Sequence, residues 1–299
     1  MLKIIDVEQK SDEWLELRRT KITASSVATA LRMNGDERYD EYINEKRTGE
    51  RRFFGNSATR YGEMFEPIAR KIFEHYEHVP VKEYGFVVNE DYPCLGVSPD
   101  GVLPDGNLLE IKCPYTRKIT GDIKNDYWQQ IQLQCSVMKA KYCHFLECDF
   151  KLEKLKKNSN LKYDLKRVLD KYLDSGELCG GIVFIGGDYL NNDCDKDWER
   201  EFRVFGPMWF PISLETCQGC MTWRHDNYFE DFIDSCEAFI KRGSTTVTSN
   251  GCFWVYKLAT CSCQKVETEP TWITTNYPRL YNVYLEFTSE ESTVQECLF

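Results

Sequence analysis

The sequence predicts a mixed α/β fold in which a central mixed β-sheet is flanked by helices, with a C-terminal extension. Three observations support this class. Capping residues and helical periodicity predict helices at residues 12–19, 57–76 and 127–138. Short apolar runs predict strands at residues 84–90, 94–98 and 142–150. Two Asp-Gly turns, at Asp100 and Asp105, add a β-hairpin, so the elements form an αβββαβ core with helices on both sides of the sheet.

The composition narrows the class of protein. With 299 residues, 42% of them hydrophobic and 29% charged, the chain is long enough for one large or two small globular domains with a sizeable core. No apolar run approaches the roughly 18 residues that cross a bilayer, and the N-terminus does not resemble a signal peptide. We therefore expect a soluble intracellular protein without membrane contact, and its fourteen cysteines are expected as reduced thiols.

The net charge of −10 argues against a general coat for nucleic acid, although an acidic protein can still carry a local basic track. Two candidate tracks are present, the group Lys46, Arg47, Arg51 and Arg52 and the lysine-rich stretch at 151–171. The alternative for both is a solvated helix face. Phe53 and Phe54 lie beside the first track, where they either stack on unpaired bases or belong to the core.

The hairpin between residues 95 and 116 carries the residues best suited to chemistry. Glu110 and Lys112 lie two residues apart on its second strand, so their side chains share one face while Ile111 points into the core. Asp100 ends the preceding strand and reaches the same face. Carboxylates suit Mg²⁺ or Mn²⁺, which lower the pKa of bound water and polarise a phosphoryl oxygen. Lys112 would orient the attacking water or offset charge on phosphorus. The alternative is a solvated hairpin with an exposed ion pair.

A second candidate site lies near the N-terminus. Arg18 falls near the end of the first predicted helix, which Ser11 caps. Thr23 can cap a further helix over residues 22–31, leaving Ser25 at its N-terminus, where free backbone N–H groups favour an anion such as phosphate. The alternative for Ser25 is an ordinary capping role.

Four segments, in the same order, resemble one family of nucleases. Asp100, Glu110 and Lys112 resemble the PD…ExK core of restriction-endonuclease-like nucleases, and their setting SPDG…LEIKCP is similar to the phage lambda exonuclease or YqaJ-type viral recombinase family. The other three segments are LRRTKITAS at 17–25, YGEMFE at 61–66 and QIQ at 130–132. The resemblance covers about residues 10–150. It implies a PD-(D/E)xK exonuclease core at 1–175 and an extension of mixed α/β content at 176–299.

The resemblance also implies an activity and its partners. It implies a Mg²⁺-dependent (or Mn²⁺-dependent) deoxyribonuclease with two ions, an exonuclease that works 5′→3′ on double-stranded DNA ends and hydrolyses phosphodiester bonds to mononucleotides. Such an enzyme serves recombination, repair or viral genome processing, beside a single-strand annealing protein, and some members are ring-shaped homotrimers. If the chain is viral, it would act in the host cytoplasm or nucleus. Two rival functions stay open, an endonuclease on the same core and a catalytically silent subunit that binds DNA ends.

Site residues follow from the same resemblance, position by position. The predicted metal ligands are Asp100, Glu110, Glu66 and the Ile111 carbonyl, with Lys112 assisting the water. The predicted pocket for the DNA 5′-phosphate consists of Arg18, Ser25, Ser98 and Gln130, and Gln132 is given a secondary role.

The C-terminal half yields fewer predictions. Strands are expected near 181–187 and 201–211, and an amphipathic helix at 226–240. Cysteines form a C-x₂-C pair at Cys217 and Cys220 and a C-x-C pair at Cys261 and Cys263. Zinc sites generally use more closely spaced pairs, so the two interpretations are a structural zinc site and scattered free thiols.

Overall fold

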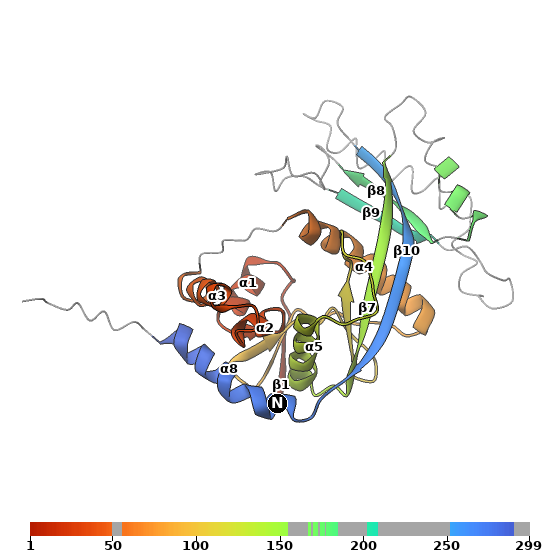
Figure 1. Cartoon of the computed structure of the whole chain (residues 1–299). Coiled ribbons are helices and arrows are strands. Elements are labelled where there is room, and N and C mark those ends of the chain that lie inside the picture. The colour runs from red at the N-terminus through yellow and green to blue at the C-terminus, as the bar shows by residue number, and fades with distance from the viewer. Residues whose placement is uncertain are drawn as a thin grey trace, which may run out of the picture.

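A computed structural model of the chain describes residues 1–49, 56–154, 167–168, 170–172, 174–176, 178–184, 202–208 and 252–289 (Figure 1). Several features singled out in the sequence lie outside these residues. They are Arg51, Arg52, Phe53, Phe54, much of the lysine-rich stretch, the expected helix at 226–240, and Cys217 and Cys220.

The described elements alternate between helices and strands along the chain. The helices are α1 (Asp12–Arg19), the 3₁₀ turn η1 (Ala24–Ser26), α2 (Val27–Ala30), α3 (Asp36–Thr48), α4 (Ser57–Glu77), α5 (Asn125–Met138) and α8 (Trp272–Thr288). The strands are β1 (Leu2–Ile5), β2 (Ile22–Thr23), β3 (Phe86–Asn89), β4 (Leu95–Val97), β5 (Gly101–Val102), β6 (Leu108–Lys112), β7 (Tyr142–Lys154), β8 (Cys179–Phe184), β9 (Phe202–Met208) and β10 (Cys252–Glu267).

Local sequence signals account for three of the helices. The predicted helices at 12–19, 57–76 and 127–138 are confirmed as α1, α4 and α5, with ends that differ by at most two residues. Ser11 caps α1 as predicted, because its side chain accepts the backbone N–H of Trp14 at 3.2 Å. Asn56 caps α4 in the same way, accepting from the N–H of Thr59 at 3.1 Å.

The helix predicted over residues 22–31 is wrong in its first half. Ile22 and Thr23 instead pair in parallel with β4, and the chain then makes the 3₁₀ turn η1 before the four-residue α2. Thr23 still acts as a cap, as predicted, because it forms a capping box with Ser26 at the start of η1, and the strand pairing of Ile22 and Thr23 sets this later start. Ser25 therefore lies in a tight turn and not at the start of a long helix.

A six-stranded mixed sheet forms the centre of the fold, in the order β5-β6-β7-β10-β8-β9. Strands β6 and β7 are parallel, and the other neighbours in this sheet are antiparallel. The predicted mixed α/β class is therefore confirmed. Strand β10 comes from the C-terminal part of the chain, yet it lies between β7 and β8 and pairs with β7 along its length (Figure 1).

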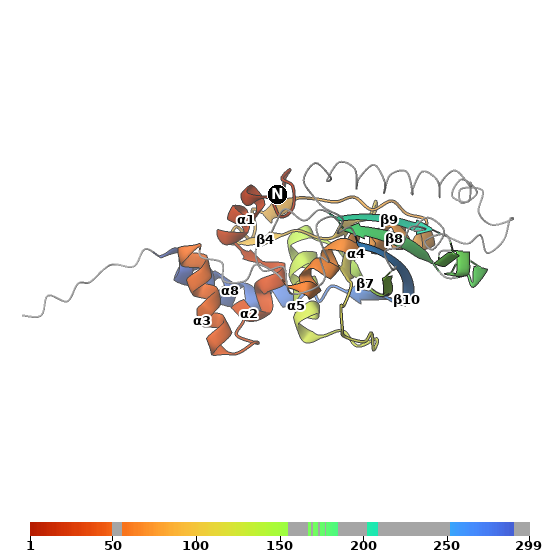
Figure 2. The same ribbon diagram turned by 90° about the horizontal axis from the view of Figure 1, so that it is seen from above.

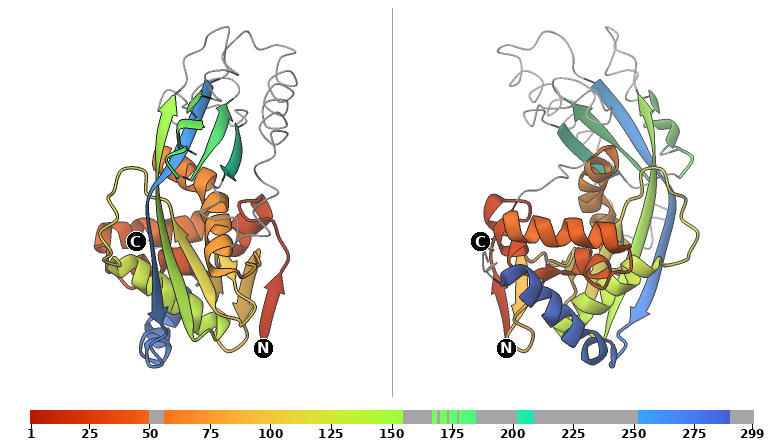
Figure 3. Two further views of the ribbon diagram at one scale, coloured as in Figure 1. Left: turned by 90° about the vertical axis from the view of Figure 1, so that its right-hand side faces the viewer. Right: turned by 60° about the vertical axis from the view of Figure 1, so that its left-hand side comes forward.

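Helices α4 and α5 cover opposite faces of β6 and β7 (Figure 3). Alternate strand residues divide between the two resulting cores, as the pleat requires. Leu108 and Phe145 join the core beneath α5, whereas Leu109 and Leu146 join the core beneath α4. All four side chains are buried. Because both faces of β6 are covered, Glu110 lies in the interior, whereas Lys112 at the end of the strand is half-buried.

A second, four-stranded sheet has the order β1-β3-β4-β2. The strands predicted at 84–90 and 94–98 belong to this sheet, although a single sheet was expected. Pro99 directly follows Ser98 at the end of this strand region, and a proline has no backbone N–H to donate to a ladder. The chain leaves this sheet there and enters β5 of the central sheet.

The C-terminal helix α8 lies beside α3 and α5 (Figure 2). Trp272 Nε1 donates to Gln129 Oε1 at 2.8 Å, and Arg47 Nη2 donates to the Glu286 carbonyl at 2.8 Å. Both β10 and α8 thus pack into the predicted nuclease core, while the division of the chain at residue 175 stays a prediction. Among the described helices, none is both long and apolar enough to cross a bilayer.

Candidate active site

The predicted β-hairpin is present and positions the candidate catalytic residues. Strands β5 and β6 pair in antiparallel fashion, with Gly101 opposite Leu109. At the turn, the Asp105 carboxylate accepts the backbone N–H of Asn107 at 3.0 Å. Gly106 has φ +82°, a conformation that residues with a Cβ seldom adopt. The Asp-Gly sequence therefore closes the turn.

Asp100 is held against the catalytic strand by its own side chain. Its Oδ2 accepts the backbone N–H of Ile111 at 2.7 Å. Its carbonyl oxygen accepts the Nε–H of Arg70 at 3.1 Å. Two elements that are distant in sequence, β6 and α4, therefore fix the orientation of Asp100.

Glu110 is fully buried, and three side chains donate hydrogen bonds to its carboxylate. Lys112 forms an ion pair with Oε1, confirming that the two residues share a face. Gln130 Nε2 donates to Oε1 at 2.6 Å, and Gln134 Nε2 donates to Oε2 at 2.8 Å. Gln134 was not identified from the sequence. Gln134 follows Gln130 by four residues, so both lie on one side of α5. This spacing is the sequence signal that could have identified Gln134.

Glu66 lies on α4 and pairs with a second residue that sequence reasoning missed. Arg70 Nη2 lies 3.2 Å from Glu66 Oε1, and Arg70 also forms an ion pair with Glu83. The Arg70 residue is only 8% exposed. The spacing of four residues between Glu66 and Arg70 was again the available signal. Arg70 thus connects Glu66 with the backbone of Asp100.

The electrostatics of this cluster show an excess of negative charge. Burial raises the pKa of Asp100, and the nearby charges of Glu110 and Glu66 raise it further. Burial likewise raises the pKa of Glu66. Burial alone would lower the pKa of Lys112, but the carboxylates of Glu110 and Asp100 outweigh it, so that pKa is raised. The Lys112 ammonium and the Arg70 guanidinium therefore face three acidic groups that repel one another.

The donor set fits a hard divalent cation. Carboxylate oxygens are the ligands that Mg²⁺ and Mn²⁺ prefer, and an added positive charge would relieve the repulsion that raises the pKa of Asp100. Within the described ranges, no three His, Cys, Asp or Glu side chains already converge as a complete metal-binding group. The oxygens of Glu110 are instead turned toward Lys112, Gln130 and Gln134.

A buried carboxylate lies next to this cluster on the neighbouring strand. Glu147 of β7 is in register with Lys112 of β6 and forms an ion pair with Arg117. Arg117 and Lys112 both lie over the ring of Tyr127, at 5.8 and 5.3 Å from its centroid. Sequence reasoning did not select Glu147 or Arg117, because their proximity depends on the pairing of β6 with β7.

Three of the four residues predicted to bind phosphate are connected in the structure. Arg18 Nη2 donates to Ser25 Oγ at 2.7 Å, and the Arg18 guanidinium lies 4.2 Å from the ring centroid of Trp14. Trp14 Nε1 in turn donates to Ser98 Oγ at 2.9 Å. Trp14 was not selected from the sequence, although it precedes Arg18 by one helical turn. Gln130, the fourth residue, donates to Glu110 instead.

Gln132 faces away from Glu110. Its Nε2 donates to the Glu267 carbonyl at 3.0 Å, and its Oε1 accepts the backbone N–H of Glu269 at 2.8 Å. Gln132 is fully buried and connects α5 to the end of β10. The structure thus bears out the expectation that Gln130 and Gln132 point in different directions on the helix.

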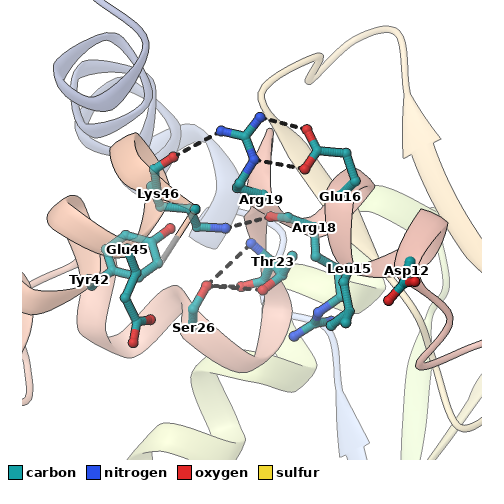
Figure 4. A pocket seen from close by; sticks show the side chains of 11 residues that line it. Asp12, Leu15, Glu16, Arg18, Arg19, Thr23, Ser26, Tyr42, Glu45 and Lys46 are labelled. Atoms are coloured by element: carbon teal, nitrogen blue, oxygen red, sulfur yellow. Dashed lines mark hydrogen bonds and ion pairs between the residues drawn. The ribbon is translucent and has the colours of Figure 1, made fainter. Parts of the chain in front are cut away.

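A cavity of about 340 Å³ adjoins the backbone of Arg18, between α1, η1 and α3 (Figure 4). Lys46 extends into this region from α3, and its Nζ donates to the carbonyls of Arg18 and Lys21 at 2.5 and 2.6 Å. Burial, followed by the positive charge of Arg18, lowers the pKa of Lys46 to about 7. Lys46 therefore stabilises the corner of the chain that carries Arg18 and does not belong to an open basic track.

Residues 13–141 match a family model that is described as the YqaJ-like viral recombinase domain. Less than half of the chain is therefore similar to this domain family. The family resemblance inferred from the four motifs is therefore confirmed. The matched region contains Arg18, the β5–β6 hairpin, and helices α4 and α5 with their glutamate and glutamines.

Relatives of the chain include two viral proteins. An uncharacterised protein of Acanthamoeba polyphaga mimivirus is 29% identical over 164 residues, which cover 49% of this chain and 30% of that protein. A protein of African swine fever virus is 25% identical over 156 residues, covering 42% of this chain and 45% of that protein. The chain thus spans less than half the length of these curated relatives.

Among solved structures, the chain is similar to an alkaline exonuclease from Laribacter hongkongensis. The two are 27% identical, with a TM-score of 0.42, and the match covers 55% of this chain and 92% of that chain. A phage-related exonuclease from Haemophilus somnus is 15% identical, with a TM-score of 0.34, over 46% of this chain and 71% of that chain.

Proposed function

We propose that this chain is a divalent-metal-dependent DNA exonuclease. It acts 5′→3′ on double-stranded ends, hydrolyses phosphodiester bonds and releases mononucleotides during recombination, repair or viral genome processing. The observation that carries the proposal is the cluster of buried Glu110 with half-buried Asp100 and Lys112 at the β5–β6 hairpin, inside the region that matches the YqaJ-like family. The surplus of carboxylates over ammonium groups supports a site that is completed by cations.

Asp100, Glu110, Glu66 and the Ile111 carbonyl would hold Mg²⁺ or Mn²⁺, with two ions expected. When bound, such ions supply an activated water and stabilise charge on the phosphoryl oxygens. The protein's own contribution is orientation. Asp100 is fixed by the N–H of Ile111, and Glu110 by the amides of α5, so the carboxylates are positioned before substrate arrives.

Lys112 acts as a hydrogen-bond donor rather than as a base. Its pKa is raised by Glu110 and Asp100, so it keeps its proton at neutral pH. A protonated lysine can orient the attacking water through a hydrogen bond and can offset negative charge on phosphorus. Proton removal from the water therefore falls to another group.

End polarity would come from the cluster around Arg18. A 5′-phosphate can accept from the Arg18 guanidinium and from the hydroxyls of Ser25 and Ser98, while the Trp14 ring holds the guanidinium in place. Gln130 would join this contact by leaving Oε1 of Glu110, to which it now donates. That exchange would leave Oε1 of Glu110 in contact with Lys112 and without Gln130 when a DNA end is bound.

The remaining assignments rest on the family. They are double-stranded DNA ends as the substrate, a single-strand annealing protein as a partner, a homotrimer as the assembly, and the host cytoplasm or nucleus as the location of a viral enzyme. The oligomeric state is tested by sedimentation of the full chain with and without DNA.

The function is tested with a linear duplex that carries a 5′-phosphate and an internal label, and with the same DNA as a closed circle. We expect digestion of the linear form alone, from its 5′ ends and only with added Mg²⁺ or Mn²⁺. Lys112→Ala should lower the rate by about 100-fold or more, the loss expected for a group that stabilises the transition state by over about 2.7 kcal/mol.

The other outcomes distinguish the rival functions. Metal-dependent cutting of the closed circle would replace the exonuclease with an endonuclease on the same core. Binding of DNA ends without any metal-dependent turnover would instead indicate that the chain is a catalytically silent subunit.

A further inference from the structure

Two cysteines face each other across the central sheet. Cys148 of β7 and Cys261 of β10 are direct partners in the antiparallel ladder, and their sulfur atoms are 3.8 Å apart. Residues directly opposite in such a ladder have Cα atoms about 4.5–5.5 Å apart, within the range of about 4.4–6.8 Å found in disulfides. We propose that Cys148 and Cys261 are a redox-active pair that forms a reversible disulfide.

The two thiols differ in exposure and in acidity, and the difference assigns their roles. Cys261 is exposed, whereas Cys148 is fully buried. The hydrogen bond between the two sulfurs lowers the pKa of Cys261, and the same bond, together with burial, raises the pKa of Cys148. Cys261 is therefore the thiolate that reacts first, and Cys148 is the thiol that resolves the product.

The oxidant is a peroxide. The Cys261 thiolate attacks one oxygen of hydrogen peroxide, which breaks the O–O bond, forms a sulfenic acid and releases hydroxide that becomes water on protonation. The Cys148 sulfur then attacks the Cys261 sulfur, so that an S–S bond forms and the S–O bond breaks. The departing hydroxide takes the proton of Cys148 and leaves as a second water. Two thiols lose two electrons in total, and exchange with a small dithiol reverses the reaction.

Rotation of the side chains is sufficient to close the remaining gap. A disulfide needs its sulfur atoms about 2.05 Å apart, so the sulfurs of this pair must approach each other by roughly 1.8 Å. The two residues are partners in the part of the ladder that runs from Thr260 to Glu267 without a shift of register, which keeps their Cα atoms in place. The bond would link β7 to β10 across 113 positions of sequence without a change of strand pairing.

The same strand provides a matched control. Cys263 is also exposed, but its ladder partner is Leu146, and its sulfur lies 3.8 Å from Nδ1 of His144. Burial, followed by the charge of Glu77, raises the pKa of Cys263 to about 11. Two cysteines separated by a single residue thus share strand and exposure, but only Cys261 has a sulfur directly across the ladder.

To test the proposal, the reduced full chain is treated with a few equivalents of hydrogen peroxide and the remaining thiols are blocked. The peptides are then mapped by mass spectrometry without reduction. We expect a Cys148–Cys261 cross-link that disappears with dithiothreitol. Cys263→Ser should retain this cross-link, and Cys261→Ser should abolish it. Brief alkylation of the reduced protein should modify Cys261 at least about tenfold faster than Cys263, because the thiolate fraction follows the pKa.

Two results would overturn the proposal. One is oxidation of Cys261 to a sulfinic acid while Cys148 stays fully available for alkylation in unfolded protein. The other is a cross-link that joins Cys261 to a different cysteine. The substitutions are made at the two exposed cysteines so that the buried core is unchanged, and circular dichroism checks that both variants fold. The cross-link is detected by mass, so the result does not depend on nuclease activity.

Discussion

Gln134 donates to Oε2 of Glu110 across 2.8 Å from a fully buried position on α5. One turn earlier, Gln130 donates to the other oxygen of the same carboxylate. A buried carboxylate needs such donors because burial without them is costly. The two contacts differ in burial, since Gln130 is partly buried and Gln134 is not accessible. Gln134 is therefore the fixed support of Glu110, and Gln130 is the one that can exchange partners.

Replacing Gln134 by methionine should lower kcat and should lower stability by less than the loss of the hydrogen bond alone would cause. Methionine has a similar volume but no donor, so Glu110 loses one of the bonds that orient it. A hydrogen bond to a charged group contributes about 1.5–3 kcal/mol, which corresponds to a loss of about tenfold or more in kcat. The Oε1 atom of Gln134 is buried without a hydrogen-bond partner among the described residues, and its removal offsets part of the cost in stability.

Gln132→Met is the matched control, because Gln132 lies on the same helix and bonds only to the backbone of residues 267 and 269 among the described contacts. This variant should unfold at a lower temperature and keep its kcat when assayed well below that temperature. Equal losses of kcat in the two variants would show that α5 contributes structure alone.

Asp100→Asn should separate the charge of Asp100 from its structural role. Asparagine can still accept the N–H of Ile111 but carries no charge, so the repulsion from Glu110 and Glu66 that raises the pKa of Asp100 disappears. Without metal, the variant should unfold at the same temperature as the wild type or above it. Millimolar Mg²⁺ or Mn²⁺ should raise the unfolding temperature of the wild type but not of the variant.

Asp105→Asn is the corresponding control in the other Asp-Gly turn. Hydrogen bonds from the backbone and side chain of Asn107 lower the pKa of Asp105, so its charge is stabilised in the folded protein. This variant should lose stability whether or not metal is present and should keep the response to metal. An Asp100→Asn variant that responds to Mg²⁺ like the wild type would remove Asp100 from the metal site.

Arg18→Gln should erase the preference for 5′-phosphorylated over 5′-hydroxyl ends. The guanidinium is held between the Trp14 ring and Ser25 and provides the charged donor of this cluster. A charge-assisted hydrogen bond of about 1.5–3 kcal/mol predicts that the preference falls by about tenfold or more in kcat/KM. Arg19→Gln is the control, because Arg19 pairs with Glu16. Loss of the preference in both variants, or in neither, would contradict the assignment of Arg18.

The sequence predicted those parts of the site whose residues are close together along the chain. Glu110 and Lys112 are two residues apart on a strand, so alternation alone placed them on one face. Helices α1 and α4 were predictable because their caps and apolar stripes are local. Contacts between distant segments were not predictable, because Arg70 contacts Asp100 and Trp14 contacts Ser98 only through tertiary packing.

Strand order was the other feature that the sequence did not reveal. β10 pairs with β7 across more than a hundred residues, and nothing in the alternation of either strand specifies that partner. The same pairing brings Cys261 opposite Cys148, which the C-x-C spacing of Cys261 and Cys263 did not indicate. The start of the helix predicted over residues 22–31 was wrong for a similar reason, because Ile22 and Thr23 pair with β4, a partner that is distant in sequence.

Lys46 should give the protein a stability that rises with pH between about 7 and 10.5. Burial and the charges of Arg18 and Arg19 lower the pKa of Lys46 to about 7, whereas in the unfolded chain it returns to its ordinary value of 10.5. Between these values the unfolded state binds one more proton than the folded state, so the free energy of unfolding increases with pH. Above this window both states are neutral at Lys46, and below it both are charged.

The comparison with Lys46→Met isolates this effect. The variant cannot titrate at residue 46, so its stability relative to the wild type should be greatest at pH 6 and should decrease as pH rises to 10, measured by urea unfolding. Arg47→Met is the control, because Arg47 is the exposed neighbour of Lys46 on α3. A difference between Lys46→Met and the wild type that is independent of pH would show that Lys46 keeps its proton. The two hydrogen bonds to the carbonyls of Arg18 and Lys21 would then persist at every pH tested.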